Sequence, residues 1–274
     1  MAAKIVFRAV HEPVLLARAA CQEPQLYRAG NTLISIYTHP APNKDTDNED
    51  CIAIVPFAED GVIIAVADGV GGLPAGAAAS ETALKVITAC IQQAASSREG
   101  IMEGIEQANQ AILASGSNSA TTLMLVEIDG YSARTYHVGD SGMLLTGQRA
   151  RLKAETNPHS PTGDGVRGGF LNELDALQHA ERNIVSNVLG SQEMHMEIGS
   201  PTTIATRDTG IVASDGLFDN LLVREIVDII RTGTLQKATR TLVDFAARRM
   251  LNSGDGIIGH PDDLSVALFR KTAP

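Results

Sequence analysis

The chain has 274 residues, of which 44% are hydrophobic and 20% charged, a composition typical of a soluble globular protein with a substantial core. Its net charge of −10 comes from 32 acidic against 22 basic residues, which argues against general nucleic-acid binding and against docking on anionic lipid. No stretch approaches ~18 uninterrupted apolar residues, so no membrane span is expected. Three widely spaced cysteines fit reduced thiols, and the N-terminus lacks the layout of a signal peptide, so we expect a cytoplasmic protein.

The first half of the chain is predicted to contain three strands followed by two helices. The strands are short runs rich in β-branched residues and bounded by turn residues, and the first helix is an Ala-rich segment without Pro or Gly. Before them, residues 1–30 mix short apolar runs with two prolines and form either an irregular lead-in or an added strand. The predicted strands cover 32–37, 51–56 and 61–67, and the helices cover 77–95 and 101–115.

The second half returns to strands and ends with two helices and a last strand. Residues 154–182 differ from their surroundings because they are rich in Pro, Gly and polar groups, with a short helix expected within 171–180. A segment of this kind inside a compact domain is more often a functional flap than a plain connection. Strands are predicted at 121–128, 133–139, 143–147, 209–214 and 264–269, and helices at 222–232 and 236–251.

The order of these elements predicts an α+β fold. Strands, two helices, more strands, two helices and a final strand suggest two sheets packed together with helices outside. No low-complexity linker divides the chain, so we expect residues 1–274 to form one domain, with 1–30 as a lead-in and 154–182 as a flap.

Aspartates recur at the ends of the predicted strands. A lone Asp at a strand end is usually a turn former, but strand ends that face a common cleft bring distant carboxylates together. Hard cations such as Mg²⁺ and Mn²⁺ prefer oxygen ligands of this kind. Four positions together therefore indicate a metal site: Asp68, Asp140, Asp215 and the pair Asp262-Asp263.

The sequence does not match the other motifs that its glycines and aspartates suggest. The run DGVGGLPAG resembles a phosphate loop, but no Lys-Ser/Thr follows Gly76, and Pro74 stands where a dinucleotide fingerprint needs its third glycine. A calcium loop beginning at Asp45 would have Asp50 in place of the glycine at its sixth position and Pro56 in place of the glutamate at its twelfth. No GxSxG motif is present to supply a serine nucleophile.

Six short motifs occur along the chain: NED (48–50), ADGVGG (67–72), ATTL (120–123), VGDS (138–141), ASDGLFD (213–219) and DDLS (262–265). Together they resemble the phosphatase 2C family, in its bacterial type. They follow the family order and spacing over roughly residues 45–270, so coincidence is a poor explanation. The resemblance implies a central β-sandwich of two antiparallel sheets flanked by helix pairs.

The resemblance also implies the role of individual residues. Asp68 is expected to bridge two Mn²⁺ or Mg²⁺ ions, and the Gly69 carbonyl to bind one of them. Asp215 and Asp262 are expected to hold the other ion, with Asp50 acting near the second metal through water.

The same resemblance implies the reaction. Asp140 matches the position that bacterial-type members use for a third, weaker metal ion. A water or hydroxide bridging two ions would attack phosphoserine or phosphothreonine in line, so the expected partner is a phosphorylated protein and no Cys or Ser nucleophile is required.

Departures from the family pattern concern the groups around the phosphate. Where the family commonly has a phosphate-binding Arg, this chain has Asp45, and the neighbouring Lys44 is a candidate replacement that lacks a bidentate fork. Val70 stands where some relatives carry a His general acid. His159, in NPHS, resembles a segment that enters the flap and is expected to structure that loop.

Two functions from different classes remain open on the sequence. The first is an active protein-serine/threonine phosphatase that is monomeric and binds neither nucleic acid nor membrane. The second is a catalytically inactive relative that serves as a regulatory or binding module. The principal carboxylates are all present and only the Arg position is lost, which favours the enzyme.

Overall fold

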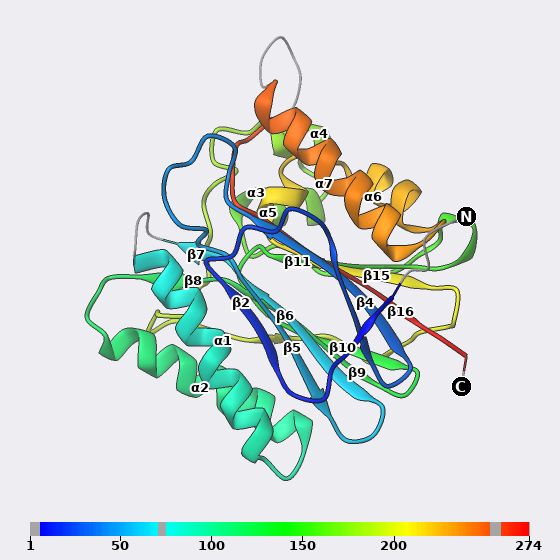
Figure 1. Cartoon of the computed structure of the whole chain (residues 1–274). Helices are drawn as coiled ribbons and strands as arrows, with labels where there is room; N and C mark the ends of the chain where they lie inside the picture. Colours follow the sequence, from blue (N-terminus) through cyan, green and yellow to red (C-terminus); the bar gives the residue numbers. More distant parts are fainter. Residues whose placement is uncertain (1–5, 71–74, 253–258, 274) are drawn as a thin grey trace.

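Two β-sheets pack face to face, and helices cover their outer faces (Figure 1). The computed structural model describes residues 6–70, 75–252 and 259–273. The first sheet has the order β1-β3-β4-β16-β15-β11-β12, with β1 Arg8–Ala9, β3 Gln25–Ala29, β4 Thr32–His39, β16 Leu264–Lys271, β15 Thr209–Ala213, β11 Gly142–Thr146 and β12 Leu152–Glu155. Its strand pairs are antiparallel apart from the short parallel pair β1–β3.

The second sheet is antiparallel and has the order β13-β10-β9-β6-β5-β2. Its strands are β13 Glu197–Ile198, β10 Ser132–Val138, β9 Leu123–Asp129, β6 Gly61–Ala67, β5 Cys51–Phe57 and β2 Val14–Ala17, while β14 Thr202–Thr203 also pairs with β10. A separate two-stranded ribbon joins β7 Gly69–Val70 to β8 Ala120–Thr121.

The core between the sheets follows from the two-residue repeat of the strands. Ile34 and Ile36 of β4 face Ile52 and Ile54 of β5 across this layer, and all four side chains are fully buried. Successive side chains of a strand point to opposite faces, so the intervening residues face the outer helix layers.

Helices α1 Ala75–Gln93 and α2 Ser97–Ala114 cover the outer face of the second sheet. A Cβ on Gly104 of α2 would lie 2.8 Å from the Ile87 Cα of α1, so the glycine allows the two helices to approach closely. The outer face of the first sheet is covered by α5 Asp215–Phe218, α6 Val223–Ile230 and α7 Leu235–Leu251. Buried leucines and isoleucines of these helices, such as Leu242 and Ile226, pack on β15 and β16.

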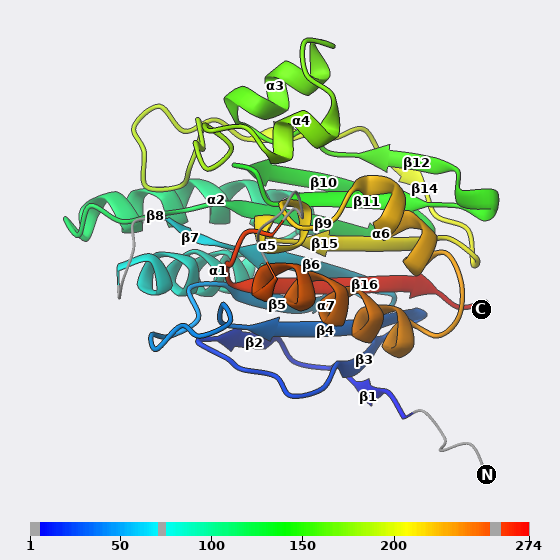
Figure 2. The same cartoon turned by 90° about the horizontal axis from the view of Figure 1, so that it is seen from above.

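The segment between β12 and β13 carries two short helices, α3 Pro161–Arg167 and α4 Glu173–Leu177, beyond the edge of the sandwich (Figure 2). Each begins at a capping side chain: Ser160 Oγ accepts from the Gly163 amide at 3.0 Å, and Asn172 Oδ1 accepts from the Asp175 amide at 2.9 Å. A 3₁₀ turn, η1 Gln148–Ala150, precedes β12.

The expected α+β sandwich with outer helices is confirmed, and each predicted strand and helix has a counterpart within a few residues. Residues 14–17 and 25–29 of the lead-in extend both sheets, as β2 and β3. The assignment of residues 1–274 to one domain with a flap at 154–182 stays a prediction. Within the described ranges, no helix is long and apolar enough to cross a membrane.

Candidate metal centre

The pairing register of the strands brings the predicted aspartates to one end of the sandwich. In the second sheet Cys51 lies opposite Ala67, so Asp50, before β5, and Asp68, after β6, leave the sheet together. In the first sheet β15 is antiparallel to both β11 and β16. Asp140 precedes β11, Asp215 follows β15 and Asp262 precedes β16, so these three also leave at one end.

The backbone of Asp68 is fixed by two threonines. Its carbonyl accepts from Thr121 Oγ1 at 2.7 Å and from the Thr122 amide at 2.8 Å, and its amide donates to Thr122 Oγ1 at 3.2 Å. Thr122 Oγ1 also shares a hydrogen bond of 2.7 Å with Ser141 Oγ. Thr122 therefore links the loop of Asp68 to the loop that carries Asp140.

Asp50 is 1% exposed and is held by serine and asparagine side chains. Ser214 Oγ donates to its Oδ2 at 2.8 Å, and the Asp50 amide donates to Asn48 Oδ1 at 3.0 Å. Ser214 Oγ also accepts from the Ser265 amide at 3.1 Å, so one hydroxyl joins a carboxylate of the second sheet to two strands of the first.

The carboxylates of this site have pKa values above their ordinary range. Burial is the main cause, and the negative charge of the neighbouring carboxylates adds to it. The pKa is raised to about 7 for Asp50 and to about 8 for Asp140 and Asp262, and burial also raises the pKa of Asp68 and Asp215. Asp262 is exposed as a residue, whereas Asp50 and Asp140 are buried, so solvent screens the shift of Asp262 more than theirs.

Three of these carboxylates keep an oxygen without a hydrogen-bond partner in the described parts of the chain. These buried atoms are the Oδ1 atoms of Asp50, Asp140 and Asp215. A buried carboxylate oxygen without a donor is costly, and a divalent cation is the partner that removes both that cost and the mutual repulsion. An all-oxygen donor set of this kind fits Mg²⁺ or Mn²⁺.

Asp219 belongs to the same group, although no role was predicted for it from the sequence. It lies one helical turn after Asp215, and its amide donates to the Asp215 carbonyl at 2.7 Å. Burial and the charges of Asp215 and Asp140 raise its pKa well above the ordinary value, while Arg182 opposes this shift. The four-residue spacing within ASDGLFD could have indicated it, since residues i and i+4 share one helix face.

A cavity beside the aspartates extends under the segment of α3 and α4. Asp140, Asp215 and Asp219 line one side, and Leu177 and Phe218 form part of an apolar wall. Arg182 lines the same cavity, and its Nε atom is buried without a hydrogen-bond partner among the described residues. The aspartates, the guanidinium of Arg182 and an apolar wall therefore surround one cavity at the flap segment.

Residues 42–245 of the chain match the family model described as protein phosphatase 2C. The chain belongs to the protein phosphatase 2C family. Protein phosphatase PhpP of Streptococcus pneumoniae serotype 2 is 29% identical over 238 residues, which cover 82% of this chain and 92% of PhpP. The predicted family resemblance is thereby confirmed.

Solved structures agree with this assignment. A serine/threonine phosphatase of S. agalactiae matches with a TM-score of 0.74 at 26% identity, covering 88% of this chain and 99% of the other. The catalytic domain of the phosphatase PstP, solved in complex with two manganese ions, matches with a TM-score of 0.72 at 20% identity and the same coverage. At 20% identity this second likeness shows the fold alone.

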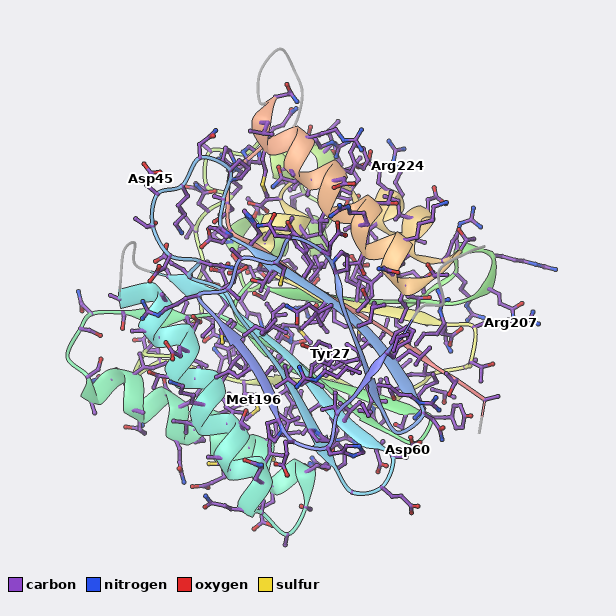
Figure 3. The ribbon with its side chains drawn as sticks, viewed as in Figure 1. Tyr27, Asp45, Asp60, Met196, Arg207 and Arg224 are labelled. Carbon is purple, nitrogen blue, oxygen red and sulfur yellow. The ribbon has the colours of Figure 1, made fainter. Side chains whose placement is uncertain are left out.

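Asp45 stands where the family commonly has a phosphate-binding arginine, and neither it nor the neighbouring Lys44 is free to take over that contact directly. Asp45 is exposed, and its side chain points away from the molecule at the margin of the loop (Figure 3). Lys44 Nζ instead contacts two carboxylates, Glu49 Oε2 at 2.8 Å and Asp263 Oδ2 at 2.7 Å. The predicted phosphate contact of Lys44 stays a prediction, and a phosphate would compete with both ion pairs.

Gly69 packs directly on the first turn of α1. A Cβ at this position would lie 2.3 Å from the Gly76 carbonyl carbon, so any larger residue would push the loop of Asp68 away from the helix. Residues 71–72 of the ADGVGG motif lie outside the described ranges. Val70, at the position of the general acid of some relatives, pairs with Ala120 in the short β7–β8 ribbon.

Proposed function

We propose that this phosphatase hydrolyses phosphoserine and phosphothreonine in proteins, with two divalent ions, Mn²⁺ or Mg²⁺, bound by its aspartates. One observation carries the proposal. Carboxylates from strand ends of both sheets converge, and three of them present buried oxygens without a protein partner in the described chain. The name of the S. pneumoniae relative, a protein phosphatase, and the serine/threonine phosphatase of S. agalactiae support the substrate class.

The division of labour among the aspartates follows their positions. Asp68 is proposed to bind both ions, with the Gly69 carbonyl on one of them. Asp215 and Asp262 are proposed to hold the other ion, and Asp50 to act near the second ion through water. Two such ions supply an activated water and positive charge for the phosphoryl oxygens.

Asp140 and Asp219 face the flap side of the centre and are proposed to hold a third, weaker ion. Both line the cavity under α3 and α4, whereas Asp50 does not. Arg182 lines this cavity too, so it can orient a phosphorylated side chain in a protein that has Asp45 at the position of the family's phosphate-binding arginine. The chain's own groups thus bind and orient the substrate and place the carboxylates for the ions.

The experiment that tests the proposal is hydrolysis of p-nitrophenyl phosphate and of a phosphothreonine peptide with Mn²⁺, with Mg²⁺ and with EDTA. Asp215→Asn is expected to lower kcat by about 10³-fold or more, equivalent to about 4 kcal/mol of transition-state stabilisation. The matched control is Asp244→Asn, because Asp244 lies on the exposed face of α7 and pairs only loosely with Arg240, at 3.6 Å.

Turnover that requires the metal and is lost only in Asp215→Asn supports the enzyme. Folded protein without turnover with either metal would favour the inactive binding module instead. The expectations of a monomeric, cytoplasmic protein that binds neither nucleic acid nor membrane belong to this proposal and are tested separately, by sedimentation and fractionation.

A further inference from the structure

A histidine cluster lies next to the metal centre, where the flap segment leaves the sandwich. His137 is on β10, directly opposite Glu197 of β13 in the register of the sheet. The ring of His159 stacks on His137 with centroids 4.4 Å apart, and the ring of His195 lies 5.2 Å from His159. His137 and His159 are 1% and 9% exposed, so these two rings are part of the interior, whereas Glu197 is exposed.

The spacing of this cluster would suit a metal ion, but its hydrogen bonds do not. One potential ligand atom from each of His137, His159 and Glu197 lies within 4.8 Å of the others. His159 Nδ1, however, accepts from the Gly139 amide at 3.1 Å and from Asn187 Nδ2 at 2.8 Å. The lone pair of His159 is therefore on Nδ1, and Nε2 carries the hydrogen that faces Glu197 Oε2 at 3.3 Å.

This assignment of the His159 tautomer depends on donors that cannot reverse. The Gly139 group is a backbone amide. The side chain of Asn187 is fixed because its Oδ1 accepts from the His195 amide at 3.1 Å and its Nδ2 donates to the His195 carbonyl at 2.7 Å. Burial also lowers the pKa of the His159 imidazole, which favours the neutral ring.

His159 forms hydrogen bonds with both the amide and the carbonyl of Gly139. Its ring accepts from the Gly139 amide, and its own amide donates to the Gly139 carbonyl at 3.0 Å. Gly139 has a φ of +103°, and a Cβ there would lie 2.7 Å from Thr122 Cβ, so the backbone is confined on its third side as well. Asp140 follows directly, with its Oδ1 atom buried and unpartnered among the described residues.

We propose that His159 is a positioning residue for Asp140: its Nδ1 atom fixes the Gly139 peptide and so aims the Asp140 carboxylate into the metal centre. The proposal rests on the proposed function, because it concerns the third ion assigned to Asp140. The His159 carbonyl also accepts from the Ser186 amide at 2.9 Å. His159 therefore connects the segments that enter and leave the flap to the loop of Asp140.

The test measures equilibrium binding of Mn²⁺ to the full chain by titration calorimetry. Asp140→Asn is the reference for loss of the weakly bound ion. His159→Leu removes the acceptor and is expected to weaken the weakest Mn²⁺ about 10- to 100-fold while the tighter ions are retained. His159→Asn places Oδ1 near the position of Nδ1 and is expected to restore binding. His195→Leu, the same change in the neighbouring ring, is the matched control and should bind like wild type.

Selective loss in His159→Leu with recovery in His159→Asn supports the proposal. Wild-type affinity in a folded His159→Leu, or equal weakening of all the ions, would overturn it. If His159→Leu does not fold, hydrogen exchange of the Gly139 amide decides instead. The amide should exchange slowly in wild type and stay protected in Asn187→Ser, which leaves the contact between Gly139 and His159 in place. Fast exchange of this amide in wild type would reject the contact. Failure of wild type to bind Mn²⁺ at all would refute the proposed metal centre rather than this inference.

Discussion

Lys44 Nζ lies 2.7 Å from Asp263 Oδ2, and the Glu49 amide donates to the same carboxylate oxygen at 2.6 Å. Asp263 Oδ1 accepts in turn from the Ala41 amide at 2.8 Å. The buried Asp263 carboxylate therefore holds the loop before Asp50 next to Asp262. Lys44, the candidate for binding phosphate, thus helps to keep two predicted metal ligands, Asp50 and Asp262, close together.

Lys44→Met is expected to destabilise the protein by about 3 kcal/mol, because it leaves the Asp263 carboxylate buried without its cation. Urea unfolding in EDTA measures this free energy directly. The matched control is Lys85→Met, whose exposed pair with Glu81 should contribute about 0.5 kcal/mol or less. A raised KM for p-nitrophenyl phosphate with unchanged stability would instead support the phosphate contact.

Asp219→Asn is expected to have opposite effects with and without metal. Removing one carboxylate from a buried group of like charges relieves repulsion, so the melting temperature in EDTA should rise. The gain in melting temperature on adding Mn²⁺ should shrink, because one oxygen ligand is lost. Thermal unfolding in both conditions tests this, and a lower melting temperature in EDTA would show that Asp219 is structural.

The sequence was sufficient where the signal is local. The two-residue repeat of Ile34, Ile36, Ile52 and Ile54 identifies buried strands, and an Asp at the end of such a strand identifies a ligand once several strand ends coincide. Short strands such as β2 and β13 carry too few residues to show a repeat, and they depend on pairing with distant partners.

Contacts between residues far apart in the chain could not be predicted. Lys44 and Asp263 are separated by 219 positions, so the sequence indicated only the charge of Lys44 and not its partners. Asp219 was missed because it is the C-cap of the short helix α5 and does not directly follow a strand. The contact of His159 with Gly139 depends on how the flap base folds back on β10.

Arg182→Ala is expected to raise KM for a phosphothreonine peptide roughly ten- to a hundredfold, the equivalent of about 1.5–3 kcal/mol for a charged hydrogen bond. The reason is that Arg182 lines the cavity beside Asp215 with a buried Nε atom that lacks a partner in the described chain. Steady-state kinetics at saturating Mn²⁺ measures the effect. Arg167→Ala, an exposed arginine of α3, is the control, and equal KM values for the two variants would exclude substrate binding by Arg182.

The raised pKa values predict how pH acts on the metal-free protein. The carboxyls of Asp50, Asp140 and Asp262 have pKa values of about 7 to 8 in the folded chain, against an ordinary value of 3.8. Between these two values the folded state binds protons that the unfolded state has released, so the free energy of unfolding falls as pH rises from about 4 to about 8 and levels off above that. In EDTA the melting temperature should therefore fall across this window and change little above it.

Mn²⁺ should reverse this trend, because it replaces the protons on the same oxygens and binds more tightly once the carboxyls are ionised. The gain in melting temperature on adding Mn²⁺ should then be larger at pH 9 than at pH 6. Asp140→Asn should flatten the pH dependence in EDTA, since it removes one of the titrating groups. A melting temperature in EDTA that does not fall between pH 6 and pH 8 would show that these carboxyls are already ionised without metal, and the electrostatic case for the metal centre would be lost.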